Sequence, residues 1–127
     1  MNEQAEALKA RTKTFALDVI RLAASVPQTI AGIVIHRQLI RAATGAAANY
    51  RAACRSRSRS EFVARMAVAL EEADEAELWL ELLRDGELLA SPELIATLSE
   101  AHQLAAIFAQ SRLTAVASLK RAKCAGH

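Results

Sequence analysis

The sequence has few of the residues that interrupt helices and few aromatic residues. Its 127 residues include only 4 Gly and 2 Pro, and aromatic side chains make up 4% of the chain, although 53% of it is hydrophobic. Ala and Leu supply most of that hydrophobic content, and both are strong helix formers. This composition predicts an all-α protein, and a chain of this length is expected to form a single domain over residues 1–127.

Cysteine pairs, a signal peptide and a membrane span are also lacking. Cys54 and Cys124 are the only cysteines, and neither belongs to a CxxC pair, so we expect one buried thiol and one tail thiol, both reduced. The first residues lack the apolar run of a signal peptide, and no apolar stretch of about 18 residues is free of charge. These features predict a cytoplasmic protein that does not cross a membrane.

The motifs of common catalytic and metal-binding classes are missing as well. None of the three histidines, His36, His102 and His127, follows a Glu by three positions, as the histidines of di-iron bundles do. Cys and His do not cluster as in a zinc site, and there is neither a Gly-rich phosphate loop nor a G-x-S-x-G turn. We therefore expect no enzymatic activity, no cofactor and no metal, and interpret His36 and His102 as core or boundary residues.

Hydrophobic residues recur at helical spacing along four segments. Pro27 ends the first segment because proline disfavours helical geometry in its neighbourhood, and Thr29 is a suitable N-cap for the second. Ser58 and Glu61 form a capping box before the third, which Gly86 ends. Short links between four helices predict an up-down-up-down four-helix bundle. The predicted helices span about residues 9–25, 30–54, 59–84 and 92–120, with residues 1–8 outside the first.

The second predicted helix has a row of arginines opposite its apolar face. At about 100° per residue, four of them fall inside an arc of about 80°, and the Arg/Ser segment at residues 55–60 adds two more. Arginine forks match phosphate oxygens, and such a row can follow a phosphate backbone. Solubility or salt bridges between subunits are the alternative roles. The candidate nucleic-acid-binding residues are Arg37, Arg41, Arg51, Arg55, Arg57 and Arg59.

Charge is distributed unevenly along the chain. Residues 1–65 contain 11 Lys and Arg against 4 Asp and Glu, whereas residues 66–127 contain 5 against 10. Such a chain can bind a polyanion through one face or pair oppositely charged faces of two subunits. The acidic run from Glu71 to Glu81 is interpreted as a solvated helix face; metal binding, or pairing with arginines of a neighbouring helix or subunit, remains open.

Three residues inside the helical segments call for neighbours that the sequence does not reveal. Asn49 lies at the edge of the apolar face, so we interpret it as a core amide that is hydrogen-bonded, with a carboxylate of the third helix as one partner; a role in a site is the alternative. Trp79 is interpreted as a core anchor whose indole N–H needs a partner. Gly45 costs about 1 kcal/mol relative to Ala in a helix, which predicts a close helix–helix contact there.

These residues resemble a known family. The similarity is to the four-helix-bundle proteins first noted as open reading frames in intervening sequences of bacterial large-subunit ribosomal RNA genes, whose relatives include the accessory variability protein of diversity-generating retroelements. Together with the first helix ending at Pro27, it spans nearly the whole chain. The matching pieces are Arg37-Gln38-Leu39, Arg41-Ala42-Ala43, Asn49-Tyr50-Arg51, the Arg/Ser segment with Glu61-Phe62, and Glu71-Glu72-Ala73-Asp74-Glu75 leading to Trp79-Leu80-Glu81-Leu82-Leu83.

The resemblance implies a four-helix bundle that assembles, in several members, into a barrel-like homopentamer with a basic surface. It also implies nucleic acid and a reverse transcriptase as partners of the retroelement relatives, whereas most members have no established activity. Our hypothesis is a non-catalytic oligomer that binds structured RNA or DNA through the arginine row, as an accessory to an RNA- or retroelement-linked process in bacteria. The alternative is a protein–protein interaction scaffold without physiological nucleic-acid binding.

Overall fold

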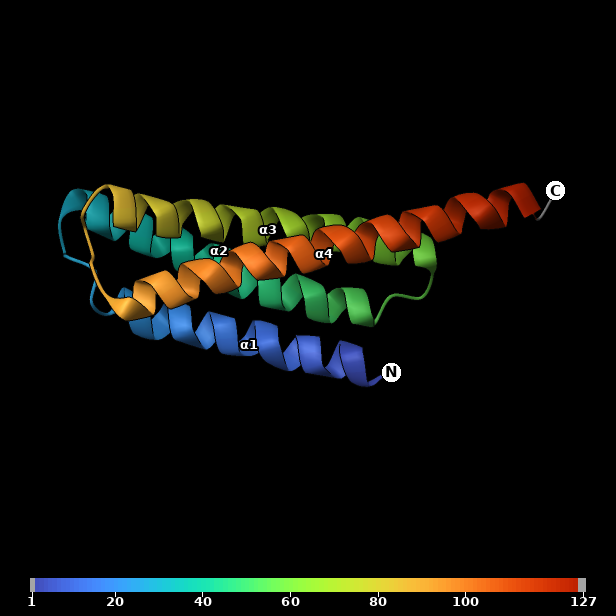
Figure 1. The fold of residues 1–127 in the computed structure, drawn as a ribbon, viewed down its shortest axis with the longest axis horizontal. Helices are drawn as coiled ribbons and strands as arrows, with labels where there is room; N and C mark the ends of the chain where they lie inside the picture. The colour runs from blue at the N-terminus through green and yellow to red at the C-terminus, as the bar shows by residue number, and fades with distance from the viewer. Residues whose placement is uncertain (1, 126–127) are drawn as a thin grey trace.

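The computed structural model describes residues 2–125, which form four α-helices and no strand. Each helix runs antiparallel to the preceding one, so the α1–α2 and α3–α4 connections lie at one end of the molecule and the α2–α3 connection at the other (Figure 1). The predicted fold class, an all-α up-down-up-down four-helix bundle, is confirmed. The helices are α1 (Glu3–Ala23), α2 (Ile30–Cys54), α3 (Arg59–Asp85) and α4 (Pro92–Ala125).

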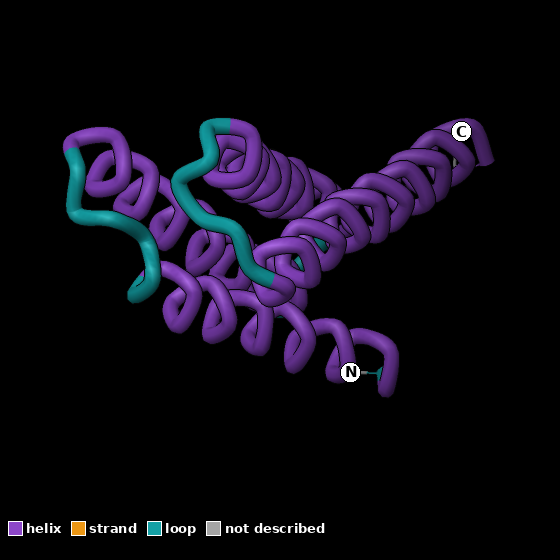
Figure 2. The backbone as a smooth tube through the Cα atoms, turned by 60° about the vertical axis from the view of Figure 1, so that its left-hand side comes forward, coloured by secondary structure: helices purple, strands orange, loops and turns teal. Residues whose placement is uncertain are grey.

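Helices that follow one another along the chain are also neighbours in space. α2 packs against α1 and α3, α4 packs against α3, and the contact between α1 and α4 closes the bundle. Figure 2 shows the α1–α2 and α3–α4 connections side by side at the nearer end. The last turns of α4 project beyond the other three helices (Figure 1). Within residues 2–125, none of the helices combines the length and apolar character needed to cross a membrane.

Side chains fix the starts of α2 and α3 at the predicted residues. The Thr29 hydroxyl accepts a hydrogen bond from the Gly32 N–H at 3.1 Å, and the Ser58 hydroxyl accepts one from the Glu61 N–H at 3.0 Å. The Glu61 carboxylate reaches back to the Arg57 N–H at 3.4 Å, one residue before the N-cap itself. These bonds satisfy donors that the first turn of a helix leaves without an intrahelical partner.

Two helices are longer than predicted. α1 begins at Glu3 rather than near residue 9, because the Asn2 side chain accepts a hydrogen bond from the Ala5 N–H at 2.8 Å and caps the helix. The prediction that this helix leaves out residues 3–8 is therefore wrong, whereas residue 1 lies outside the described residues. α4 continues to Ala125, beyond the predicted end near residue 120.

Gly86 ends α3, as predicted. Gly86 stays at a φ of −81°, and it is the next residue, Glu87, that adopts the left-handed conformation, with a φ of 56°. A Cβ atom at residue 86 would lie 2.7 Å from the carbonyl oxygen of Leu82. Glycine is needed here because it leaves room for this carbonyl, which accepts the Gly86 N–H at 2.9 Å.

The core changes character along the bundle. Towards the α1–α2 connection it consists mainly of large aliphatic side chains around Phe15, Leu39 and Leu80. Towards the α2–α3 connection, alanines of α2 and α3 meet beneath one aromatic pair, in which the rings of Tyr50 and Phe108 stack with centroids 5.3 Å apart. Burial raises the pKa of the Tyr50 hydroxyl above its ordinary value. Phe108, the last fully buried residue of α4, thus fixes that helix beside the end of α2.

An ion pair joins the first and last helices. Arg11 of α1 donates from Nε and Nη2 to the two carboxylate oxygens of Glu100 in α4, at 2.7 and 2.6 Å, and also to Gln103 at 3.0 Å. The hydrogen bond to Glu100 raises the pKa of Arg11 above its ordinary value. A bidentate, partly buried pair of this kind fixes the relative orientation of two helices.

Replacing Phe108 with alanine tests the core that positions α4. Phe108→Ala is expected to lower the free energy of unfolding by about 3–5 kcal/mol, because the cavity left behind can only partly collapse. Leu113→Ala, at a residue of the same helix that is 57% exposed, is the matched control and should change stability little. Urea denaturation followed by circular dichroism measures both, and similar effects of the two substitutions would contradict the assignment of Phe108 to the core.

Candidate nucleic-acid interface

The six predicted arginines do not form one continuous row in the structure. All six are exposed, but they point to different neighbours. Arg41 leans towards α3, Arg51 and Arg55 lie beside α1, and Arg57 and Arg59 follow at the α2–α3 connection. Arg37 has no ion pair within residues 2–125 and lies one turn of α2 before Arg41. The arc predicted from helical geometry therefore divides into separate environments.

Arg41 belongs to the contact between α2 and α3. Its Nη2 atom donates to Glu75 at 2.7 Å, and its Nη1 atom lies 3.4 Å from both carboxylate oxygens of Glu72. The Glu72 side chain is only 16% exposed, so Arg41 supplies positive charge to a carboxylate that is largely shielded from water. Of the roles left open for the acidic run, pairing with an arginine of the neighbouring helix is the one that these two carboxylates have.

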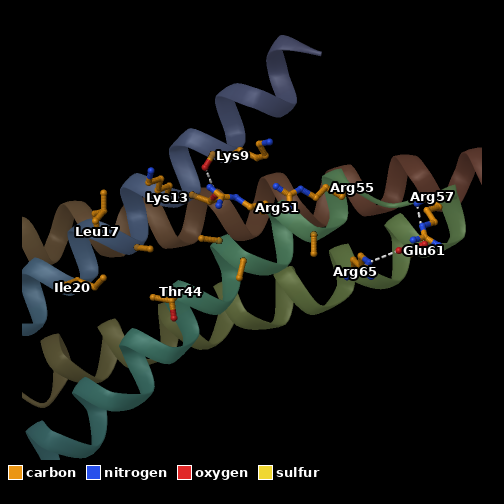
Figure 3. A pocket seen from close by; sticks show the side chains of 15 residues that line it. Lys9, Lys13, Leu17, Ile20, Thr44, Arg51, Arg55, Arg57, Glu61 and Arg65 are labelled. Atoms are coloured by element: carbon orange, nitrogen blue, oxygen red, sulfur yellow. Dashed lines mark hydrogen bonds and ion pairs between the residues drawn. The ribbon is translucent and has the colours of Figure 1, made fainter. Parts of the chain in front are cut away.

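Arg51 and Arg55 line a groove between α1 and α2. The groove encloses about 850 Å³. Figure 3 shows Lys9 and Lys13 reaching it from α1, opposite Arg51 and Arg55 of α2. Arg57 lies at the end where α3 begins, beside the pair formed by Glu61 and Arg65 (Figure 3). Basic side chains from two helices and a connection thus meet on one hollow surface.

Small side chains on α2 create this groove. Beyond Thr44, three of the α2 residues that line the groove are alanines, whose small side chains leave the space between α1 and α2 unfilled. On the α1 side, Leu17 and Ile20 stay 40% and 46% exposed because no large side chain of α2 covers them. The floor is therefore apolar and the rim basic. The floor consists of Ala16, Leu17 and Ile20 of α1 and Ala47, Ala48 and Ala52 of α2.

Most of the charge in the groove is uncompensated. Lys9 pairs with Glu6 at 3.3 Å and Arg65 with Glu61 at 3.0 Å. The hydrogen bond from Arg65, together with the one from the Arg57 N–H, lowers the pKa of Glu61 below its ordinary value. In the described part of the chain, four cations at this surface have no ion-pair partner. They are Lys13, Arg51, Arg55 and Arg57.

Sequence reasoning missed the lysines of the groove. Lys9 and Lys13 are four residues apart and therefore share one face of α1. The sequence did not connect that face with the arginines, because the packing of α1 on α2 was unknown. Arg65 was missed because its ion-pair partner, Glu61, had already been assigned to the cap of the third helix.

The remaining polar candidates have local explanations. The Asn49 amide donates to the Gly45 carbonyl oxygen at 2.8 Å, which confirms a hydrogen-bonded amide, although the partner is its own helix rather than a carboxylate of α3. A Cβ atom at residue 45 would lie 2.7 Å from Glu72 Oε2. The close contact predicted at Gly45 is confirmed, and a side chain of α3 makes it. The Trp79 indole nitrogen is buried without a partner within residues 2–125.

Within residues 2–125, His36, His102 and the acidic run form no metal site, and His127 lies outside the described residues. His36 is half-buried, with Nδ1 3.1 Å from the Ala23 carbonyl oxygen. The interpretation of His102 as a core or boundary residue is wrong, because its side chain is 75% exposed and only its Nδ1 atom contacts Glu77, at 2.8 Å. Among residues 2–125, no group of three or more His, Cys, Asp and Glu side chains is placed to hold a metal ion. Cys54 is half-buried, Cys124 is exposed, and both are free.

Comparison with known proteins identifies the family. A family model described as 23S rRNA-intervening sequence protein matches residues 6–110. The chain belongs to this family. It is also similar to a crystal structure from Bacteroides thetaiotaomicron, described as a protein with unknown function from the S23 ribosomal protein family, with a TM-score of 0.74 and 26% sequence identity over 82% of this chain and 96% of that one. No curated protein matches.

Two single substitutions compare Arg41, which forms ion pairs with α3, with Arg37, which forms none within residues 2–125. Arg41→Ala should lower the free energy of unfolding by about 1 kcal/mol, since it leaves Glu72 shielded and unpaired. Arg37→Ala removes the same charge from the same helix without breaking an ion pair, so we expect almost no change. Urea denaturation at low salt compares them, and equal effects would show that the Arg41 pairs contribute nothing.

Proposed function

We propose that the protein binds the phosphate backbone of structured RNA or DNA through the groove between α1 and α2, without catalysing a reaction. The convergence of Lys13, Arg51, Arg55 and Arg57 on this groove, with no ion pair to any of the four side chains in the described chain, is the observation on which the proposal rests. Four neighbouring cations repel one another, and a polyanion relieves that repulsion while releasing its own counterions.

The lining of the groove favours contact with the backbone over reading of bases. Arginines offer paired donors to phosphate oxygens, whereas no aromatic side chain among residues 2–125 lines the groove and could stack on a base. Tyr50 and Phe108 are buried and stack on each other. Binding is therefore expected to depend little on sequence and strongly on salt, as phosphate contacts do.

Family membership supports a link to RNA. The family is named after 23S rRNA intervening sequences, and the chain belongs to it through residues 6–110. We propose an accessory role in an RNA-linked process of a bacterium. The resemblance to retroelement accessory proteins extends the proposal to a retroelement-linked process, with a reverse-transcriptase-type protein as partner.

Removing the groove cations tests the proposal. We expect the triple variant R51A/R55A/R57A to bind a labelled hairpin RNA and a labelled DNA duplex more weakly, with a slope of log affinity against log salt that is smaller by about 2.7 for three lost duplex contacts. Fluorescence anisotropy at several salt concentrations measures both quantities.

The control is R21A/R37A/R84A, which removes the same charge at exposed positions outside the groove. It should keep most of the affinity and the slope. If both triple variants lose affinity equally, binding reflects net charge alone and the groove is not the site.

A second candidate function, assembly through an apolar face, rests on a different surface. Val34 of α2 and Leu78 and Leu82 of α3 are 50%, 47% and 40% exposed. The Arg41–Glu75 pair fixes the register of these antiparallel helices. Val34 lies two turns before Arg41 and Leu82 lies two turns after Glu75, so Val34 and Leu82 lie at the same level of the bundle. We propose that this α2–α3 face packs against another copy, giving the homo-oligomer expected from the resemblance.

The charges on this face favour a cyclic arrangement. Glu71 and Asp74 are exposed next to the apolar residues, and no ion pair engages them within residues 2–125. In a two-fold dimer built on this face, these carboxylates would approach their own counterparts. A head-to-tail contact with a different face avoids this repulsion and closes into a ring when the rotation allows, as in the pentamer that the resemblance implies. A scaffold that binds only proteins would use the same face.

The double substitution L78E/L82E is expected to reduce the mass of the assembly, because it introduces charge at the centre of the apolar face. The substitution Ile95→Glu, at an α4 residue that is 55% exposed, is the control and should preserve the mass. Light scattering measures each. A monomeric mass for the unmodified protein would rule out the oligomer.

A further inference from the structure

The second half of α4 extends past the part of the chain that matches the family. The family model ends at residue 110, yet α4 continues without interruption to Ala125. The 15 residues from 111 to 125 correspond to about 22 Å of helix. We call this segment, residues 111–125, the α4 extension. Its last turns project beyond the other helices (Figure 1).

The α4 extension is purely basic. Residues 101–125 contain four cations and neither Asp nor Glu. Lys120, Arg121 and Lys123 are exposed, and none of them forms an ion pair inside the described range. The carboxylates of α4, Glu93 and Glu100, lie in its first half.

The α4 extension leaves the bundle at the same end as the basic groove. α2 and α4 run in the same direction, and the Tyr50–Phe108 stack places residue 50 of α2 beside residue 108 of α4. Five residues further along each helix lie Arg55 and Leu113. The α4 extension therefore passes the α2–α3 connection, with Arg57 and Arg59, and continues beyond it. Its three exposed cations, Lys120, Arg121 and Lys123, therefore lie beyond the end of the bundle at which the basic groove opens.

Compensation of the helix dipole does not account for this charge. The C-terminal end of a helix resembles about half a negative charge, and one cation in the last turn offsets it; Lys123 occupies that turn. Three exposed cations leave an excess of about two positive charges. Insertion into a lipid surface is also disfavoured, because a membrane-binding face needs large exposed apolar side chains, and beyond Leu113 no residue of α4 up to Ala125 provides one.

We propose that the α4 extension is a second phosphate-binding arm, which lies along the backbone of a double-helical nucleic acid held in the α1–α2 groove. This inference rests on the proposed function. A rigid arm of about 22 Å matches a duplex, whose phosphates recur about every 3.4 Å along each strand, so that it spans about six base pairs. A single strand would need aromatic platforms for its bases, and no Phe, Tyr or Trp occurs between residues 109 and 125.

The test compares duplexes of two lengths. The variant K120A/R121A/K123A should bind a 20-base-pair duplex with a salt slope smaller by about 2.7. It should bind an 8-base-pair duplex almost like the unmodified protein, since a short duplex that fills the groove does not reach the arm. K120R/K123R keeps the charge and should behave like the unmodified protein with both duplexes. Far-UV circular dichroism verifies that each variant keeps its helical content.

Each outcome decides the inference. An equal loss for both duplexes would reduce the effect to net charge, and an unchanged 20-base-pair affinity, with R51A/R55A/R57A still impaired, would overturn the arm while the groove stands. Absence of duplex binding by the unmodified protein would overturn the proposed function itself. If K120A/R121A/K123A loses binding only to vesicles of anionic phosphatidylglycerol, the arm binds lipid instead and the inference is overturned.

Discussion

The close approach of α2 and α3 is the constraint on which the rest of the structure depends. Alanines of both helices meet along this contact, and Gly45 admits the Glu72 side chain directly against the α2 backbone. Small side chains bury less apolar area than leucines would, and each missing methylene lowers the stabilisation by about 0.8 kcal/mol. The stacked rings of Tyr50 and Phe108 therefore contribute a larger share of the stability of this part of the core. The same shortage of bulk on α2 leaves its α1-facing side unfilled, and this is where the groove lies.

The bundle could be predicted from the sequence because local signals specify it. Thr29 and Ser58 cap the helices that they were expected to cap, and the apolar periodicity identified the buried faces. The start of α1 was missed because Asn2 stands before a polar stretch that hides the helix. At the end of α3, the sequence marked the correct glycine but not the left-handed Glu87, since the position of the Leu82 carbonyl depends on the whole turn.

The candidate site was predictable only in part. Helical geometry placed the arginines on one arc, but whether an arginine faces a carboxylate depends on the register between two helices. Arg41 meets Glu72 and Glu75 for this reason, and Arg51 meets none of the acidic run. The contribution of Lys13 needed the packing of α1 on α2, which no pattern within either helix determines. The basic side chains therefore gather at the end of the bundle near the α2–α3 connection, whereas the acidic run of α3 lies further from that end.

The hydrogen bonds of the α2–α3 connection have a consequence for the entropy of binding. Glu61 accepts the Arg57 N–H while its own N–H is held by Ser58, so the four residues from 55 to 58 are ordered before any partner arrives. Fixing the backbone of one flexible residue costs roughly 1–2 kcal/mol of conformational entropy. A disordered connection would incur that cost on association, whereas the backbone that carries Arg55 and Arg57 is already fixed here. The free energy of their contacts then goes into the complex rather than into folding a loop.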